Sequence, residues 1–364
     1  MRKAFSVDVK PDWEAFRDCI LRKGTPKRVH FIELFLDEEV QEAICKRYGI
    51  GPEPDPNDLI SGLKRQIALQ RFLGYDYVRY RVEGFHMPLK RTAVEDTAAL
   101  RREGGRGFME EHKGPITSWG DFEKYPWPNP AAAPTPALEW YEKNLPDDMC
   151  LVASGGFGHF CEYLTWLMGY ETLCFALYEQ RDLVEAISRR LLEIYRVVLE
   201  RLLHSGRMKI IWGSDDMGFK TGPMISPNDM RAFVLPGHKV MARMSHDAGR
   251  PYILHSCGDL RTIIAELIDE VRIDGKHSFE DTIERVTELK DTWGKRIALL
   301  GGIDVDFLCR ANERQVRRRV RKTLEKCMPG GGYCLGTGNS VANYIPVDNY
   351  LAMLDEGRKW GRQR

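Results

Sequence analysis

Residues 182–216, DLVEAISRRLLEIYRVVLERLLHSGRMKIIWGSDD, contain the pattern that decides the fold. In the first part, apolar residues recur at three- and four-residue steps until Gly206, which is typical of an amphipathic helix that ends on a glycine. The second part, KIIWGSDD at 209–216, is a short apolar run that ends on polar residues, which is typical of a buried strand. A helix followed directly by a buried strand predicts one unit of a parallel α/β sheet.

Similar runs recur along the rest of the chain, and most are followed by polar or glycine residues and then by a helix-like segment. Eight alternating units joined by right-handed crossovers predict an α/β fold of the (β/α)₈ TIM-barrel type. The alternative is an open doubly wound sheet, but no G-x-G-x-x-G follows the first run and no acidic residue is placed to hold a ribose. The other runs are 29–34, 75–80, 150–155, 251–258, 274–279, 297–304 and 333–338.

The domain organisation follows from the same pattern. We expect residues 1–24 to form an N-terminal helical extension and residues 25–364 to form a single barrel domain. Within the barrel, residues 81–149 are the least regular and mix Gly, Pro, Trp and charge. They predict a long excursion after the second strand, either a lid over the barrel mouth or a plain surface insertion.

Composition excludes several classes of partner. Lys and Arg number 54 against 53 Asp and Glu, so no bulk charge favours nucleic acid or an anionic membrane. No stretch reaches the roughly 18 apolar residues of a membrane span, and the N-terminus lacks the apolar segment of a signal peptide. We therefore expect a cytoplasmic enzyme, in which the nine cysteines are free thiols or metal ligands.

A histidine and a cysteine end one of the predicted strands, in PYILHSCGDL at 251–260. His255 and Cys257 are either packed core residues or metal ligands, and a third ligand decides between these readings. Cys334, in GGYCLGTGNS, ends another predicted strand, and the carboxyl ends of parallel barrel strands open onto one face. One imidazole and two thiolates suit Zn²⁺ and leave its fourth position open, which predicts a catalytic zinc that binds a substrate thiol.

Other polar side chains at predicted strand ends are candidates for the same face. As catalytic carboxylates we expect Glu33, Asp215 and Asp304, although each could instead cap a loop or lie on the surface. Asp216 follows Asp215 in GSDD and offers a second carboxylate there. For substrate binding we expect His159, His277 and Asn339, with a structural histidine or a turn residue as the alternative roles.

Several segments resemble the uroporphyrinogen decarboxylase superfamily in order and spacing. They are HSCGD, ALLGGIDVDFL and GGYCLGTGNSVANYIPVDNYLAML, together with EEHKGPITSWGDFEKYPWP and SDDMGFKTGPMISP. The resemblance implies a TIM barrel and divides the options into true decarboxylases and cobalamin-dependent methyltransferases. The resemblance implies that true decarboxylases carry an arginine-rich motif near the N-terminus, whereas KRVHFIELFLDEEV at 27–40 offers Glu33, Asp37, Glu38 and Glu39 where arginines would be needed.

The methyltransferase branch is therefore the resemblance we favour. It implies that His255, Cys257 and Cys334 bind zinc, as in enzymes that transfer methyl from methylcobalamin to coenzyme M. It also implies a corrinoid carried by a partner protein, a small-molecule methyl donor or acceptor, and a role in one-carbon metabolism. The alternatives are a metal-independent decarboxylase of a tetrapyrrole or other carboxylate, and a binding module in which a closed zinc site is structural.

Overall fold

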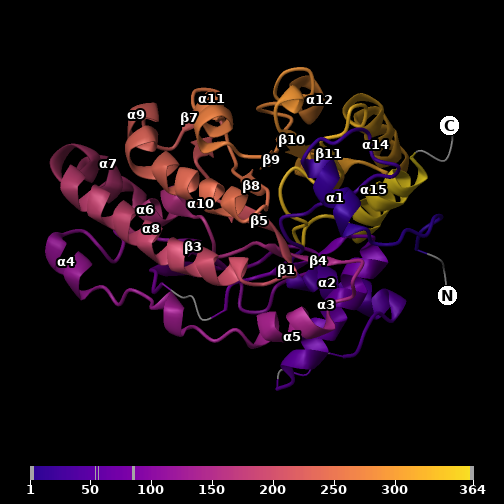
Figure 1. The fold of residues 1–364 in the computed structure, drawn as a ribbon, viewed down its shortest axis with the longest axis horizontal. Coiled ribbons are helices and arrows are strands. Elements are labelled where there is room, and N and C mark those ends of the chain that lie inside the picture. Colours follow the sequence, from indigo (N-terminus) through magenta and orange to yellow (C-terminus); the bar gives the residue numbers. More distant parts are fainter. Residues whose placement is uncertain (1–3, 54, 56, 84–86, 361–364) are drawn as a thin grey trace.

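The computed structural model describes residues 4–53, 55, 57–83 and 87–360. The ends of the predicted extension and barrel, and residues 84–86 of the predicted excursion, lie outside the described residues. A seven-stranded parallel sheet, in the order β1-β4-β5-β8-β9-β10-β11, curls into a barrel wall with helices outside it (Figure 1). Its strands are β1 (Tyr77–Tyr80), β4 (Cys150–Ala153), β5 (Met208–Ser214), β8 (Tyr252–His255), β9 (Gly275–His277), β10 (Ala298–Leu300) and β11 (Tyr333–Cys334).

These strands fall within seven of the eight predicted runs, or within one residue of them, so the α/β barrel prediction is confirmed. The remaining run, 29–34, is an extended segment rather than a regular strand. It runs parallel to the chain just after β11 through single bridges from Phe31 to Leu335 and, beyond the run, from Leu36 to Val341. On its other side, the Tyr77 hydroxyl donates to the Glu33 carbonyl at 3.2 Å and accepts from the Glu33 amide at 3.0 Å. A side chain thus replaces the backbone ladder between this segment and β1.

Helices connect consecutive strands and cover the outside of the wall. Their apolar faces pack on the sheet, as in α8 (Arg181–Leu203), where Leu191, Val198 and Leu202 are buried. The main helices are α1 (Trp13–Ile20), α2 (Glu38–Tyr48), α3 (Leu59–Leu73), α5 (Pro136–Asn144), α6 (Phe160–Met168), α7 (Tyr170–Glu179), α8 (Arg181–Leu203), α10 (Leu235–Asp247), α13 (Val305–Arg310), α14 (Glu313–Cys327) and α15 (Val347–Lys359). Shorter helices are α4 (Trp119–Lys124), α9 (Pro227–Asp229), α11 (Ile264–Glu266) and α12 (Val286–Leu289).

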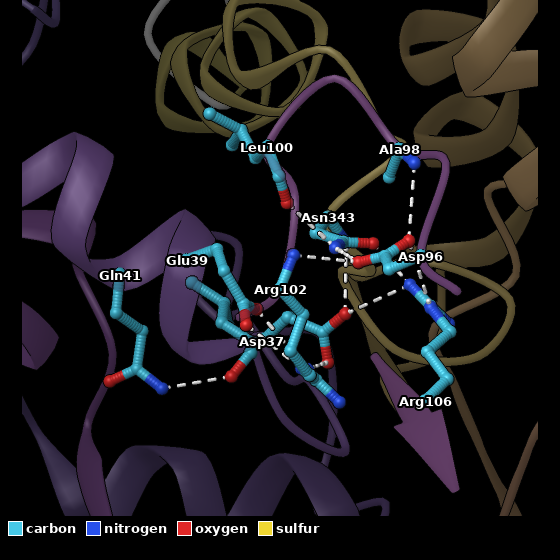
Figure 2. A network of polar contacts seen from close by, with 10 residues as sticks. Asp37, Glu39, Gln41, Asp96, Ala98, Leu100, Arg102, Arg106 and Asn343 are labelled. Atoms are coloured by element: carbon cyan, nitrogen blue, oxygen red, sulfur yellow. Dashed lines mark hydrogen bonds and ion pairs between the residues drawn. The ribbon is translucent and has the colours of Figure 1, made fainter. Parts of the chain in front are cut away.

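The segment between β1 and β4 is long and carries little regular structure on the sheet. It contains an antiparallel hairpin, and a polar network fastens the loop between the hairpin strands to the barrel (Figure 2). Arg102 contacts Glu39 at 2.8 Å and Asp37 at 3.1 Å, at the start of α2. Asn343, beyond β11, donates to Asp96 at 2.6 Å. The hairpin strands are β2 (Arg91–Val94) and β3 (Arg106–Met109), and a second hairpin, β6 (Gly218–Phe219) with β7 (Gly222–Pro223), follows β5.

Candidate metal and active site

Two neighbouring strands, β5 and β8, are followed by polar side chains at the barrel mouth. Asp216 follows β5, His255 ends β8, and Cys257 lies two residues beyond it. Among the described residues, these three form a group whose potential metal-ligand atoms all lie within 4.8 Å of one another. The parallel register explains why these side chains lie together. β5 and β8 pair with Ser214 opposite His255, so Asp216 and Cys257, each two residues further along, also lie close to each other.

The donor atoms of this group point toward one another. His255 Nε2 lies 3.2 Å from Asp216 Oδ1 and 3.5 Å from Cys257 Sγ. The Cys257 amide donates to Asp216 Oδ1 at 2.9 Å, which ties the loop after β8 to the end of β5. One nitrogen, one sulfur and one oxygen therefore converge, and each of these donor types binds zinc in proteins.

His277, the last residue of β9, orients His255. Their Nδ1 atoms lie 2.7 Å apart, and His277 is fully buried with its ring edge against Trp212. Burial, followed by the neighbouring His255, lowers the pKa of His277 well below its usual value, so its ring is neutral. When His255 donates from Nδ1 to this neutral ring and its Nε2 gives up the proton that bonds Asp216, a lone pair at Nε2 faces Asp216 and Cys257. Ligating histidines in metalloproteins are commonly fixed through the other ring nitrogen in this way.

The electrostatics of the group favour a cation. Burial, followed by the charge of Asp216, raises the pKa of the Cys257 thiol well above its usual value. Burial opposes ionisation of Asp216 as well, but hydrogen bonds from His255 and from the Cys257 amide keep its pKa below the ordinary range. Asn339 Nδ2 donates to Cys257 Sγ at 3.2 Å, so a thiolate there has one preformed hydrogen bond. The remaining charge needs a positive partner, which a metal ion would supply.

The comparisons with known proteins agree with this architecture. A family model described as uroporphyrinogen decarboxylase matches residues 113–360, well over half of the chain. The chain belongs to the uroporphyrinogen decarboxylase family. That confirms the resemblance seen in the sequence and, with it, the barrel fold of this family.

Solved structures share the fold at low sequence identity. A methyltransferase from Methanosarcina mazei is 15% identical, with a TM-score of 0.68 over 95% of this chain and 98% of that chain. A putative vitamin-B12 independent methionine synthase from Listeria monocytogenes is 13% identical, with a TM-score of 0.50 over 98% and 99% of the two chains. No curated protein matches the chain. In the described part of the family barrel, no helix has the length and apolar character of a membrane span.

Cys334 lies apart from the group that contains His255 and Cys257. It is completely buried near the amino ends of the strands, where it is hydrogen bonded to Cys19 of the N-terminal helix α1. The reason is depth along β11: the chain passes Cys334 before it reaches the mouth at Gly336 and Thr337. The structure thus brings together two of the three predicted ligands, and Asp216 stands third beside them.

Asp215 and His159 both contact the start of α6, the helix that follows β4. The Asp215 carboxylate is buried and accepts the amides of Cys161 and Glu162, both at 2.9 Å, at the start of α6. It also contacts His238 Nε2 at 2.9 Å. Adjacent strand residues point to opposite faces, so Asp215 faces α6 while Asp216 faces the mouth. His159 precedes α6 and contacts Glu162 Oε2 at 2.5 Å.

The other two predicted carboxylates differ in environment. Glu33 is buried against Thr337, whose amide donates to Oε1 at 2.8 Å and whose hydroxyl donates to Oε2 at 2.5 Å. Burial raises the pKa of Glu33 to about 8, although the Thr337 bonds oppose that rise. Asp304 caps α13 by accepting the Phe307 amide at 2.8 Å. Glu33 is therefore a buried acid, whereas Asp304 is tied to a helix terminus.

A cavity of about 640 Å³ opens beside the group, between the loops that follow β9, β10 and β11. Asn339, a predicted substrate-binding residue, lines this cavity and also contacts Cys257. Sequence reasoning did not single out Ser278, whose hydroxyl lies 3.7 Å from Cys257 Sγ. Its position after the strand that ends on His277 was the available signal.

Proposed function

We propose that this protein is a zinc-dependent methyltransferase that moves a methyl group between a corrinoid carried by a separate protein and a thiol substrate. One observation carries the proposal: Asp216, His255 and Cys257 converge within 4.8 Å at the mouth of a family barrel. Three protein ligands fill three of the four positions around a tetrahedral zinc. The fourth position stays open for water or substrate, which is the arrangement of catalytic zinc sites. The methyltransferase from Methanosarcina mazei with the same fold supports this choice within the family.

The residues present fit such a metal. Their donor atoms already converge, and the Cys257 thiol needs a nearby cation before it can ionise at neutral pH. Bound there, zinc would lower the pKa of a substrate thiol and so present a thiolate at neutral pH. A thiolate is the nucleophile that methyl transfer requires.

The remaining residues of the group position these ligands. His277 fixes the ring of His255 through the 2.7 Å contact between their Nδ1 atoms. Asn339 donates to Cys257 Sγ, which stabilises negative charge on the sulfur and holds the loop after β11 over the cavity. Glu33, with its pKa of about 8, keeps its proton at neutral pH and does not add a negative charge to the barrel interior.

The metal content of purified protein tests this proposal. We expect about one zinc per chain in the wild type, loss of zinc in Cys257→Ser, and retention in the matched variant Cys334→Ser. Elemental mass spectrometry after mild chelation, with circular dichroism as the folding control, makes the measurement. Equal metal content in the wild type and Cys257→Ser would contradict the site.

Methyl transfer is then measured directly. The spectrum of methylcobalamin changes on loss of its methyl group, so the zinc-loaded protein is mixed with methylcobalamin and a set of thiols. We expect turnover that depends on both zinc and Cys257. The family description favours a second candidate, decarboxylation of a carboxylate substrate without a metal. Carbon dioxide release by zinc-free protein, with no demethylation of methylcobalamin, would establish that candidate instead.

A further inference from the structure

One lysine is buried beside the candidate metal group. Lys276, in β9, is 4% exposed and is the only buried lysine among the described residues. Its ammonium donates to the Ser278 carbonyl at 2.6 Å and to the Ser256 carbonyl at 3.4 Å. It also lies 4.6 Å from the centre of the Phe279 ring, and it forms no ion pair with a carboxylate in the described part of the chain. Two carbonyls and an aromatic face therefore hold this cation in place of a counterion.

The two carbonyls belong to segments that shape the metal group. Ser256 directly precedes Cys257, and the Ser278 hydroxyl lies 3.7 Å from Cys257 Sγ. β8 and β9 pair in parallel register up to their last residues, so the segments that follow these strands lie side by side. The Lys276 ammonium thus joins both segments next to the sulfur ligand.

Fastening alone does not distinguish this lysine. Arg358 is also buried, and it donates to the carbonyls of Val7 at 3.2 Å and Phe72 at 2.7 Å. A buried cation bonded to carbonyls therefore holds segments together elsewhere in this fold. The distinguishing feature of Lys276 is the negative charge that surrounds it.

Two of the groups that act on Lys276 are candidate metal ligands. Burial lowers the pKa of Lys276 to about 8, and negative groups nearby oppose that fall. The strongest opposing group is Cys257, followed by Glu284, Asp216 and Glu280. The two glutamates line a cavity of about 10 Å³ together with Lys276. The ammonium therefore keeps its charge at pH 7, and that charge acts on Cys257 and Asp216.

The charge of Lys276 completes the balance of a loaded site. The Cys257 thiolate and the Asp216 carboxylate would neutralise a divalent zinc, while a neutral His255 adds no charge. A substrate bound through a thiolate then gives the group one net negative charge. Because the surroundings are partly removed from water, a nearby cation stabilises that charge more strongly than it would in bulk solvent.

We propose that Lys276 is a positioning residue that fixes the loop of Cys257 and stabilises a substrate bound to the metal through an anionic sulfur. The inference rests on the proposed function, because it concerns the ligand at the open position of the zinc. When a neutral thiol binds, its S–H bond breaks, the proton passes to the solvent, and the sulfur lone pair bonds to the metal. Lys276 takes no part in that proton transfer and contributes through its charge. It therefore favours an anionic ligand over a neutral one.

Calorimetric titration of the full-length, zinc-loaded protein tests this role with two probes. The first, 2-mercaptoethanol, binds with loss of its proton, and titration in buffers of different ionisation heat measures the protons released. The second, imidazole, binds the open position as a neutral ligand. We expect Lys276→Gln, which keeps one donor but removes the charge, to weaken thiol binding by about tenfold, equivalent to one unit in the pKa of the thiol. Imidazole affinity should not fall.

Two further variants separate charge from fastening. Lys276→Met removes both the charge and the donor, and should lose as much thiol affinity as Lys276→Gln. Lys290→Met is the matched control, because Lys290 is a partly buried lysine that donates to the Gly331 carbonyl at 2.6 Å, before β11. We expect it to leave both affinities unchanged. Circular dichroism and zinc content are measured for every variant.

The outcomes distinguish this inference from the proposed function. A wild type without zinc, or one that does not bind the thiol, would contradict the proposed function itself. In a wild type that passes both tests, unchanged thiol affinity in Lys276→Gln would overturn the role of Lys276 alone. An equal fall in thiol and imidazole affinity, or loss of zinc or of folding in Lys276→Gln, would also overturn it, because the lysine would then only hold the loop.

Discussion

Two groups of cysteine and histidine occupy opposite ends of the same barrel. At the mouth, His255 and Cys257 converge with Asp216. Near the amino ends of the strands, Cys334 is hydrogen bonded to Cys19, and His30 is fixed by Asp76 through a 2.7 Å contact at Nδ1. The two groups contain the same types of side chain, yet within the described residues only the mouth group brings three such ligand atoms within 4.8 Å.

The difference lies in what covers each group. The group that contains Cys334 and Cys19 is covered by helix α1, which lies against β11 (Figure 1). The Cys19 thiol donates to the Tyr333 carbonyl at 3.3 Å. The hydrogen bond with Cys334 lowers the pKa of Cys19 to about 7, while burial raises the pKa of Cys334 well above its usual value. At the mouth, 41% of the Asp216 side chain remains exposed. Similar residues therefore stabilise the fold at one end and are available for chemistry at the other.

The largest difference between the two ends concerns their aspartates. Asp76 is fully buried and holds Arg28, His30 at 2.7 Å and the Asp12 amide at 2.7 Å. We expect Asp76→Ala to lower the free energy of unfolding by about 3–5 kcal/mol, because it leaves buried charged and polar groups without a partner. In metal-free protein, Asp216→Ala should change it by less than about 1 kcal/mol. Urea denaturation with chelator measures both, and equal losses would contradict the comparison.

The buried acid Glu33 makes a pH-dependent contribution. Its pKa of about 8 in the folded protein lies above the ordinary 4.5, so folding favours the protonated form. Stability from this group is complete below about pH 4.5 and is lost as pH rises through about 8. We expect Glu33→Gln to show no such loss, so its stability advantage over the wild type grows between pH 5 and pH 9 to a few kcal/mol, on the order expected for such a shift.

Thermal unfolding of both proteins across this pH range measures the effect. Subtracting the two curves cancels the groups that titrate equally in each protein. A difference that does not vary with pH would show that Glu33 is already ionised in the folded state.

The hydrogen bond from Asn339 to Cys257 predicts a smaller effect at the mouth. We expect Asn339→Ala to weaken zinc binding by about tenfold, since groups that hydrogen bond to metal ligands typically contribute at this level. Competition with a chromophoric chelator measures the affinity. Asn144→Ala, which removes an exposed amide bonded to the Trp140 carbonyl, is the matched control and should not change it.

The smallest expected effect is at Cys334. Cys334→Ala removes one buried sulfur and should lower the free energy of unfolding by about 1 kcal/mol, the usual result of a small cavity. Zinc content should not change. If zinc were lost together with stability, Cys334 would reach the mouth in the metal-bound protein, as its position in the sequence predicted.

Much of the fold could be read from local patterns. Short apolar runs that end on polar residues, as at 209–216 and 251–258, located seven strands of the sheet. The segment 29–34 has the same pattern but is joined to β1 through the Tyr77 side chain rather than a ladder. Local sequence does not report which partner completes a strand, because that depends on residues far along the chain.

The candidate site was only partly predictable from sequence patterns. His255 and Cys257 were recognisable because a strand end and a one-residue spacing place them together whatever the tertiary structure. Asp216 and Cys334 were not distinguishable in this way. Which of them meets His255 depends on the depth at which β5 and β11 reach the mouth and on the face each side chain occupies.

The sequence by itself determined the alternation of strands and helices, the family and the pair His255 and Cys257, because each depends on residues close together in the chain. Only the tertiary structure decided that Asp216 joins this pair and that Cys334 is hydrogen bonded to Cys19. Those facts depend on strand register, on side-chain direction and on the burial of charge, which arise only when distant segments pack together.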